Sequence, residues 1–209
     1  MQPSLREIAL CDKCEQNLPW IKAACQHCGI ALNGANCANC LSQRPTFERL
    51  TGLFEYAWPV NAFIAKLKYG AQLPFGKILG HLLTKHYQQR YPIDVIIPMP
   101  LHQSRQQERG FNQCIEIGRY LSKNLNLPLD WRSCTKIKDT PSQALLSAAR
   151  RIRNVSENAF AISPSFAASS VLVIEDVVTT ATTVNAFARA LKRHGVNTVE
   201  ILSVCRTSL

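Results

Sequence analysis

The side chains best suited to chemistry lie in Val171–Thr183, which has the sequence VLVIEDVVTTATT. Four apolar residues open this segment, and such a run is typical of a strand buried on both faces. Two carboxylates, Glu175 and Asp176, follow directly, and a threonine-rich turn then leads into a helical pattern from about 184 to 194. Carboxylates accept hydrogen bonds from a ribose diol, and the N–H groups at a helix N-terminus favour an anion. The order predicts a sugar-phosphate site, although an ordinary strand–helix connection with threonine caps is the alternative.

This order of residues resembles the phosphoribosyl-pyrophosphate loop of type I phosphoribosyltransferases. The resemblance implies that Glu175 and Asp176 hold the ribose hydroxyls and that the following loop holds the 5-phosphate. The predicted ligand-binding set is Glu175, Asp176, Thr179, Thr180, Ala181, Thr182 and Thr183. Two residues depart from the family pattern, because Glu175 stands where Asp is usual and Ala181 replaces the loop glycine. If position 181 needs a positive φ, its Cβ costs about 1–2 kcal/mol.

Three CxxC pairs make the N-terminal segment a candidate metal site. They are Cys11/Cys14, Cys25/Cys28 and Cys37/Cys40. Tetrahedral Zn²⁺ takes four thiolates, and two CxxC turns joined by a short hairpin supply that geometry. We predict structural zinc on Cys25, Cys28, Cys37 and Cys40. The pair Cys11 and Cys14 is then an alternative half-site, half of a second site, or a reduced structural pair.

The composition is that of a folded globular protein, with 46% hydrophobic and 18% charged residues among 209. This length suits one domain of ordinary size with a small appendage. The N-terminus has no basic segment followed by an apolar run, and no stretch approaches the ~18 apolar residues of a membrane span. We therefore expect a cytoplasmic protein without membrane insertion.

The net charge of +10 is concentrated in the middle of the chain. Between residues 101 and 155 ten Lys/Arg face four Asp/Glu, a net charge of +6. Such a patch attracts a diphosphate ligand or a nucleic-acid backbone, whereas the alternative is a solvated basic surface.

Hydrophobic periodicity predicts alternating strands and helices after the cysteine-rich segment. Strands are expected at 47–56, 94–97, 171–174 and 198–205, and helices at 61–68, 74–89, 112–125 and 184–194. Lys66, Lys68 and Tyr69 end the first of these helices, where they could contact an anion or only complement the negative helix pole. Gly195 is expected to cap the last helix. We interpret Cys114, Cys134 and Cys205 as buried apolar residues, since they show no metal-ligand spacing.

A second motif follows the strand at 94–97, with the sequence PMPL and then RQQERGFNQ. Its cations, Arg105 and Arg109, lie close to a strand end, where open α/β sheets bind ligands. The combination resembles the hallmark of the ComF family, competence proteins built on a phosphoribosyltransferase-like domain. The segment TPSQALLSAARRIRNVSENAF and the terminal CRTSL fit the same family. The matching residues of that segment are Gln143, Leu146, Arg151, Arg153, Asn154 and Phe160.

We predict an α/β protein with a mostly parallel sheet of type I phosphoribosyltransferase type. A zinc-ribbon module is expected at 1–45 and the phosphoribosyltransferase-like domain at 46–209. Arg105, Arg109, Arg151 and Arg153 are candidate contacts for pyrophosphate or nucleic acid, and a charged helix face is the alternative for the last two.

The resemblance implies a factor in DNA uptake that handles single-stranded DNA. Phe111, Trp131 and Tyr69 are candidate stacking platforms for the bases, and a place in the core is the alternative for Phe111. The resemblance also implies phosphoribosyl pyrophosphate with Mg²⁺ as a ligand and other DNA-uptake proteins as partners. The alternative is an enzyme that transfers phosphoribose to a base, and a third hypothesis makes the donor a regulatory ligand that sets DNA affinity.

Overall fold

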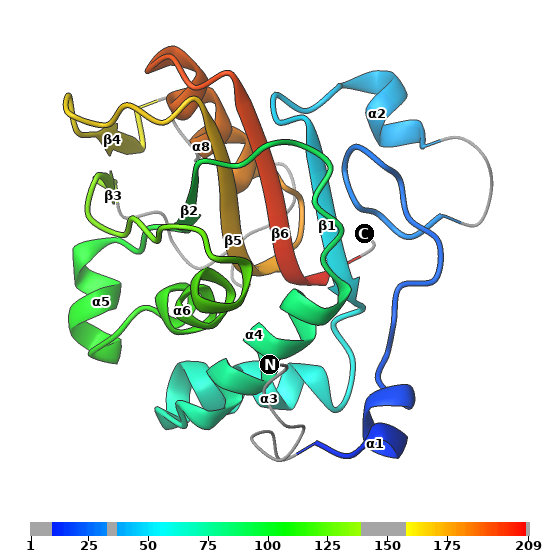
Figure 1. Ribbon diagram of the computed structural model, residues 1–209. Coiled ribbons are helices and arrows are strands. Elements are labelled where there is room, and N and C mark those ends of the chain that lie inside the picture. Colours follow the sequence, from blue (N-terminus) through cyan, green and yellow to red (C-terminus); the bar gives the residue numbers. More distant parts are fainter. Residues whose placement is uncertain (1–9, 33–36, 139–157, 208–209) are drawn as a thin grey trace.

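A four-stranded parallel sheet forms the centre of the computed structural model, which describes residues 10–32, 37–138 and 158–207 (Figure 1). The strand order is β1 (Arg49–Phe54), β6 (Thr198–Arg206), β5 (Ser170–Val178) and β2 (Val95–Pro98). All neighbouring strands are parallel, with Leu172 of β5 opposite Glu200 of β6 and Ile96 of β2. The predicted parallel α/β fold is confirmed.

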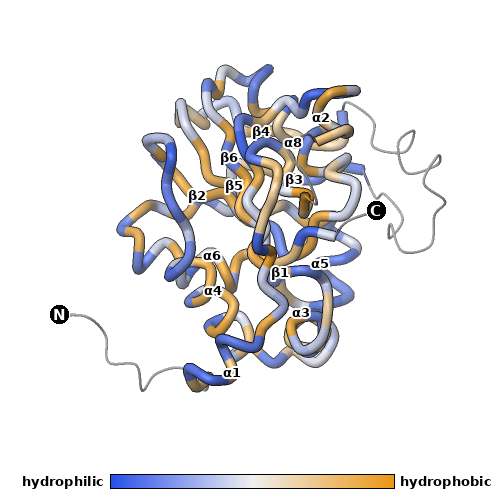
Figure 2. The backbone as a smooth tube through the Cα atoms, turned by 90° about the vertical axis from the view of Figure 1, so that its right-hand side faces the viewer, coloured by the Kyte–Doolittle hydropathy of each residue, from blue (hydrophilic) through white to orange (hydrophobic). Residues whose placement is uncertain are grey.

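The central strand β5 is buried on both faces, as its apolar run predicts. Val171 and Val173 belong to one core cluster, whereas Leu172 and Ile174 belong to the other. The alternation follows the two-residue period of a strand, so each face of the sheet has its own core. Figure 2 shows the hydrophobic residues concentrated along the strands in the interior.

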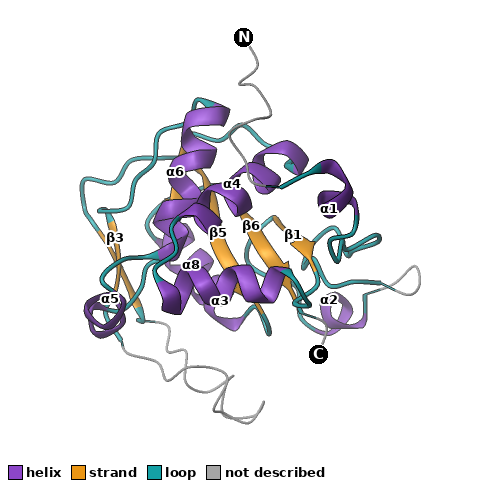
Figure 3. Cartoon of the chain, turned by 90° about the horizontal axis from the view of Figure 1, so that it is seen from below, coloured by secondary structure: helices purple, strands orange, loops and turns teal. Residues whose placement is uncertain are grey.

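Helices cover both faces of the sheet. On one face lie α3 (Val60–Gly70), α4 (Pro74–His86) and α6 (Gln113–Leu125), whose buried side chains include Ile64, Leu79 and Ile117. On the other lie α8 (Thr182–Arg193) and a small antiparallel pair, β3 (Cys134–Lys136) and β4 (Phe160–Ile162). The sheet is therefore a middle layer (Figure 3). Within the described ranges, no helix is long and apolar enough to cross a membrane.

Helix bounds follow local capping. Asn112 caps α6, because its Oδ1 accepts a hydrogen bond from the Cys114 N–H at 2.8 Å. Gly195, with φ +104°, follows the end of α8 as expected. The predicted helix at 74–89 ends earlier, at His86. The short helix α5 (Gln103–Arg109) lies in a segment for which no element was predicted.

The strand that carries the acid pair is longer than predicted. β5 continues to Val178, so Glu175 and Asp176 lie within the strand and do not follow it. Pairing with β6 extends as far as Val178 and Arg206, which explains the extra length.

The cysteine-rich segment, with α1 (Asp12–Gln16) and α2 (Ala38–Ser42), packs along β1. The Ile21 N–H donates to the Leu53 carbonyl at 2.9 Å, and the Leu50 N–H donates to the His27 carbonyl at 2.8 Å. Gly29, with φ +68°, allows the close approach, since a Cβ there would lie 2.8 Å from the Leu50 carbonyl oxygen. The boundary at 45/46 stays a prediction, and the two parts share a hydrogen-bonded seam.

Close packing of α4 on α6 depends on Gly80, where an added Cβ would lie 2.7 Å from Tyr120 Cβ. We predict that overpacking in Gly80→Ala lowers the free energy of unfolding by about 1–3 kcal/mol. The higher helix propensity of alanine offsets about 1 kcal/mol of that loss. Gly70→Ala is the control, because its nearest contact would be an ordinary 3.7 Å. Urea denaturation measures the free energy of unfolding of both variants. Equal values would contradict the close packing of α4 on α6 at Gly80.

Candidate functional site

Four cysteines meet in the N-terminal segment as predicted. The Sγ atoms of Cys25, Cys28, Cys37 and Cys40 all lie within 4.8 Å of one another. Cys25 Sγ is 3.6 Å from Cys40 Sγ, and Cys28 Sγ is 3.5 Å from Cys37 Sγ. Tetrahedral zinc with Zn–S bonds of ~2.3 Å requires S···S separations of roughly 3.8 Å. The donor set therefore fits zinc, which would hold the two turns together.

The surroundings shift the pKa values of these thiols in opposite directions, because burial raises those of Cys28 and Cys40. Burial opposes ionisation of Cys25, but the backbone N–H groups of Cys28 and His27 outweigh it and lower the pKa of the Cys25 thiol to about 7. The group does not include His27. Cys11 and Cys14 are exposed at α1 and lie outside the group, so they are not an alternative half of this site.

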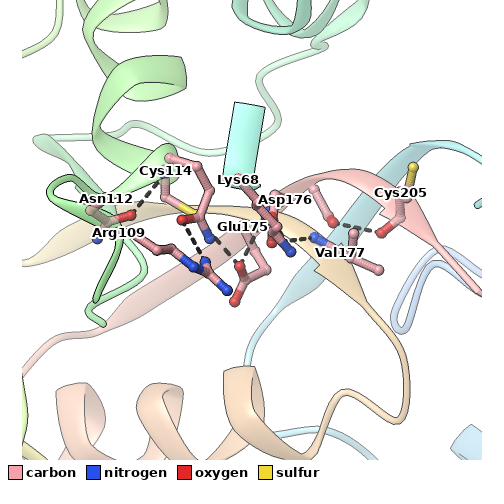
Figure 4. A network of polar contacts seen from close by, with 10 residues as sticks. Lys68, Arg109, Asn112, Cys114, Glu175, Asp176, Val177 and Cys205 are labelled. Atoms are coloured by element: carbon pink, nitrogen blue, oxygen red, sulfur yellow. Dashed lines mark hydrogen bonds and ion pairs between the residues drawn. The ribbon is translucent and has the colours of Figure 1, made fainter. Parts of the chain in front are cut away.

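The acid pair of β5 lies in a polar cluster with two residues from distant elements (Figure 4). The Lys68 ammonium, at the end of α3, forms an ion pair with Asp176, whose side chain is 4% exposed. The Cys114 thiol, in the first turn of α6, donates to Glu175 Oε1 at 3.5 Å. Each carboxylate also accepts the N–H of the next residue, at 3.0 Å for Glu175 and 2.8 Å for Asp176.

Opposite pKa shifts make this cluster nearly neutral. Burial and then the charge of Asp176 raise the pKa of Glu175 to about 8, so Glu175 is mostly protonated at pH 7. Burial opposes ionisation of Asp176, but the Lys68 ammonium outweighs it and lowers the pKa of that carboxyl. Burial raises the pKa of the Cys114 thiol well above its usual value. One anion, Asp176, therefore faces one cation, Lys68.

The same cluster is a poor metal site. Donor atoms of Cys114, Glu175 and Asp176 lie within 4.8 Å of one another. However, Cys114 and Glu175 hold protons at neutral pH, and the third donor is already paired with an ammonium. A hydroxyl-rich ligand suits these groups better, because Glu175 can donate a hydrogen bond and Asp176 can accept one.

Of the two arginines in the RQQERGFNQ motif, Arg109 lies next to this cluster (Figure 4). Its Nη1 donates to Gln113 Oε1 at 3.1 Å, and its guanidinium carbon lies 5.4 Å from the centre of the Tyr69 ring. Arg105 instead pairs with Glu108 within α5, at 3.4 Å. The two predicted anion contacts are thus arranged differently, and Arg109 is the one beside the site.

The threonine-rich loop has the conformation in which a glycine is favoured. Ala181 adopts φ 59° and ψ 6°, the left-handed region, at the N-cap of α8. The N-cap residue Ala181 has no side chain that can cap the helix, and no acid occupies the first turn, so this N-terminus has the positive potential that suits an anion. Thr180 and Thr182 join their hydroxyls across the loop at 2.9 Å. The positive φ considered from the sequence is confirmed.

The other sequence predictions have mixed outcomes. Arg151 and Arg153, with Gln143, Leu146 and Asn154, lie outside the described residues. Phe111 packs against the core, whereas Tyr69 and Trp131 are 77% and 43% exposed. Sequence analysis did not predict that Lys68 pairs with Asp176 or that Cys114 contacts Glu175. Of the two alternatives for the basic end of the helix predicted at 61–68, the ion pair of Lys68 with Asp176 supports contact with an anion over a dipole contact alone.

Comparison with known proteins identifies relatives over nearly the whole chain. The phosphoribosyl transferase domain model matches residues 113–208. "DNA utilization protein YhgH" of Shigella flexneri is 32% identical over 215 residues, which cover 99% of this chain and 94% of that protein. "Competence protein F" of Haemophilus influenzae is 30% identical over 209 residues, which cover 94% of this chain and 90% of that protein.

Similar solved structures include a glutamine phosphoribosylpyrophosphate amidotransferase from B. subtilis and a hypoxanthine phosphoribosyltransferase from Staphylococcus aureus. The first has a TM-score of 0.42 and 16% identity, and the match covers 62% of this chain but only 26% of that chain. The second has a TM-score of 0.31 and 21% identity, with 61% of this chain and 59% of that chain covered.

If the four clustered thiols bind zinc, one substitution among them should release it. We predict that Cys37→Ser lowers the zinc content of the purified protein from about one ion per chain to a small fraction of that. Cys11→Ser should retain the ion, since Cys11 lies outside the group. Metal analysis of both variants checks this, and zinc loss from Cys11→Ser would show that the first pair contributes.

The left-handed conformation of Ala181 predicts a gain from glycine. Ala181→Gly should raise the free energy of unfolding by about 1 kcal/mol by relieving strain. If the loop binds phosphoribosyl pyrophosphate, the substitution should also tighten that binding, because a glycine lets the backbone approach the phosphate more closely. Ala71→Gly is the matched control, since Ala71 also has a positive φ, 48°, but lies outside the loop. Equal stability gains with an affinity gain only for Ala181→Gly are expected in denaturation and calorimetry. An affinity gain in both variants would contradict the assignment of the loop.

Proposed function

This chain belongs to the ComF family of competence and DNA-utilization proteins, and from that premise we propose that it acts in DNA uptake or use by binding single-stranded DNA and a phosphoribosyl-pyrophosphate-type ligand. The observation that carries the proposal is the adjacency of two sites. Lys68 pairs with Asp176, while its neighbour Tyr69 stands exposed beneath the guanidinium of Arg109. One end of α3 thus belongs to both a sugar-phosphate site and an aromatic, cationic surface.

The acid pair and the loop after it support the sugar-phosphate ligand. A ribose diol suits the combination of a protonated Glu175 and an ionised Asp176, which offers a donor and an acceptor. A phosphate suits the N-terminus of α8, which has no acid in its first turn, and the hydroxyls of the threonine loop. Mg²⁺ would accompany the diphosphate and be held mainly by its oxygens, as is usual for this cation.

Two exposed aromatic rings with stacked cations support DNA binding. Arg109 lies over Tyr69 at 5.4 Å, and Arg132 lies over Trp131 at 4.5 Å. Bases of any sequence stack on such rings, and guanidinium groups add cation–π and phosphate contacts. The net charge of +10 favours the same polyanion.

Binding of the small ligand is expected to alter DNA affinity through Lys68. A ribose that approaches Asp176 competes with the Lys68 ammonium for the carboxylate, and a resulting shift of the end of α3 would carry Tyr69 with it. This supports the donor as a regulatory ligand. Phosphoribose transfer to a base remains the alternative, and the strained Ala181 in the phosphate loop weighs against it.

The cellular setting belongs to the same proposal. The four-cysteine site and the reduced CxxC pair favour a reducing compartment, the cytoplasm, in which thiols persist. Other DNA-uptake proteins are the expected partners, as the names of the relatives suggest.

Binding of a labelled single-stranded oligonucleotide, measured by fluorescence anisotropy, tests the proposal. We expect Tyr69→Ala and Trp131→Ala each to weaken DNA binding roughly 5- to 100-fold, from ~1–3 kcal/mol of stacking per base. Tyr91→Ala is the control, because Tyr91 is also exposed but precedes β2. It therefore lies toward the amino ends of the strands, whereas the acid pair lies toward their carboxyl ends.

The same titrations at two salt concentrations, with and without phosphoribosyl pyrophosphate and Mg²⁺, separate the alternatives. Salt-sensitive DNA binding that the small ligand changes supports the regulated DNA factor. Saturable binding of the small ligand without any DNA binding would instead favour the transferase. Equal losses in all three aromatic variants would argue against a defined stacking surface.

A further inference from the structure

Arg206, the last residue of β6, is a buried cation that the proposed function does not use. It is 2% exposed, and β6 places it between β1 and β5, near the ends of both strands. Figure 1 shows this end of β6 beside β1, the strand against which the cysteine-rich segment packs. Arg206 therefore lies between the cysteine cluster and the threonine loop.

The guanidinium group donates hydrogen bonds in both directions. Its Nε donates to the carbonyl of Cys28, one of the four clustered cysteines, at 2.9 Å. Its Nη1 donates to the carbonyl of Val178 at 3.3 Å and to that of Thr179, where the loop begins. A further bond to the Thr207 carbonyl, at 2.9 Å, fixes the fork. One rigid planar group thus joins a metal-ligand turn to the ligand loop.

The carbonyl oxygens accept hydrogen bonds from Nε and Nη1 of Arg206 but do not balance its charge. Within the described ranges, no carboxylate forms an ion pair with it. Four thiolates around Zn²⁺ carry a net charge of −2, so a loaded cluster would supply the counter-charge that a buried guanidinium requires.

The fold makes room for Arg206 at one specific position. Gly52 of β1 lies directly against it, and a Cβ at Gly52 would stand 2.4 Å from Arg206 Cβ. The arginine stem therefore passes across β1 toward Cys28 only because position 52 has no side chain. Both its placement and its contacts are set by packed strands, which limits the geometries that the fork can adopt.

We propose that Arg206 is a positioning residue that couples metal occupancy of the cysteine cluster to the conformation of the loop at 178–183. With zinc bound, the Cys28 carbonyl and the cluster charge hold the guanidinium, and the guanidinium holds the carbonyls of Val178 and Thr179. Without zinc, the Cys28 turn loses its constraint, and the loop loses the group that fixes its first two carbonyls. The effect on ligand binding rests on the proposed function, whereas the effect on loop order does not.

Hydrogen exchange of the full chain tests the coupling without any ligand. We expect the amides of 178–184 to exchange at least fivefold faster after zinc is removed by a chelator, while those of α4 and α6 keep their protection. In Arg206→Lys, which retains the charge but cannot bridge both sides, the loop should exchange fast even with zinc bound. Arg119→Lys is the matched control, because Arg119 lies exposed on α6 and its side chain is 63% exposed.

Two results would overturn the proposal. One is a loop whose exchange is unchanged by zinc removal in the wild-type protein. The other is faster exchange in the loop only in parallel with α4 and α6, which would indicate general unfolding. These wild-type measurements stand even if Arg206→Lys fails to fold.

Calorimetry with phosphoribosyl pyrophosphate then tests the functional consequence. Zinc removal should weaken binding at least fivefold, and the ligand should raise the affinity for zinc by the same factor, since such coupling is reciprocal. Arg206→Lys should reduce the factor to about one. A loop that responds to zinc in a protein that does not bind this ligand would refute the proposed function and leave the coupling intact. Ligand affinity independent of zinc would refute the coupling at this site.

Discussion

The parallel direction of all four strands in the main sheet is the constraint on which the candidate site depends. Because the strands share a direction, the segments that follow β1, β2, β5 and β6 all leave the sheet on one side, at the carboxyl ends of the strands. The acid pair, the threonine loop, the RGFNQ turn, the end of α3 and Arg206 come together there, although they are far apart in the sequence. An antiparallel arrangement of the same strands would distribute these groups between the two opposite ends of the sheet.

At the carboxyl ends of the strands, the protein buries several charged groups close to groups that compensate them. Lys68 balances Asp176, and Glu175 keeps a proton, so the cluster does not carry an uncompensated charge. Arg206 is buried among carbonyl oxygens, one of which belongs to Cys28. Each arrangement is sensitive to an arriving ligand, because a phosphate, a ribose or a metal ion changes the local balance of charge. The same property suits a protein that responds to ligands.

Local sequence was sufficient to predict the local parts of this structure. The apolar run of β5, the threonine loop and the four clustered cysteines are contiguous motifs, and periodicity located α3, α4, α6 and α8 to within a few residues. The contacts of Lys68 with Asp176, and of Cys114 with Glu175, join residues more than 60 positions apart, and only the packed fold determines them. The positive φ of Ala181 was considered from the sequence, because the family pattern has a glycine at this position and glycine is usual where φ is positive.

The seam between the cysteine-rich segment and β1 has a consequence for self-association. β1 is an edge strand of the sheet, and such edges present unpaired backbone groups that recruit strands from other molecules. Residues 20–28 cover this edge through the bonds from Ile21 and to His27. The opposite edge, β2, is covered in a similar way by the backbone at Pro128 and Asp130. The small N-terminal segment therefore covers an edge that could otherwise pair with a strand of another molecule. A chain without this segment would expose β1 to intermolecular β-pairing.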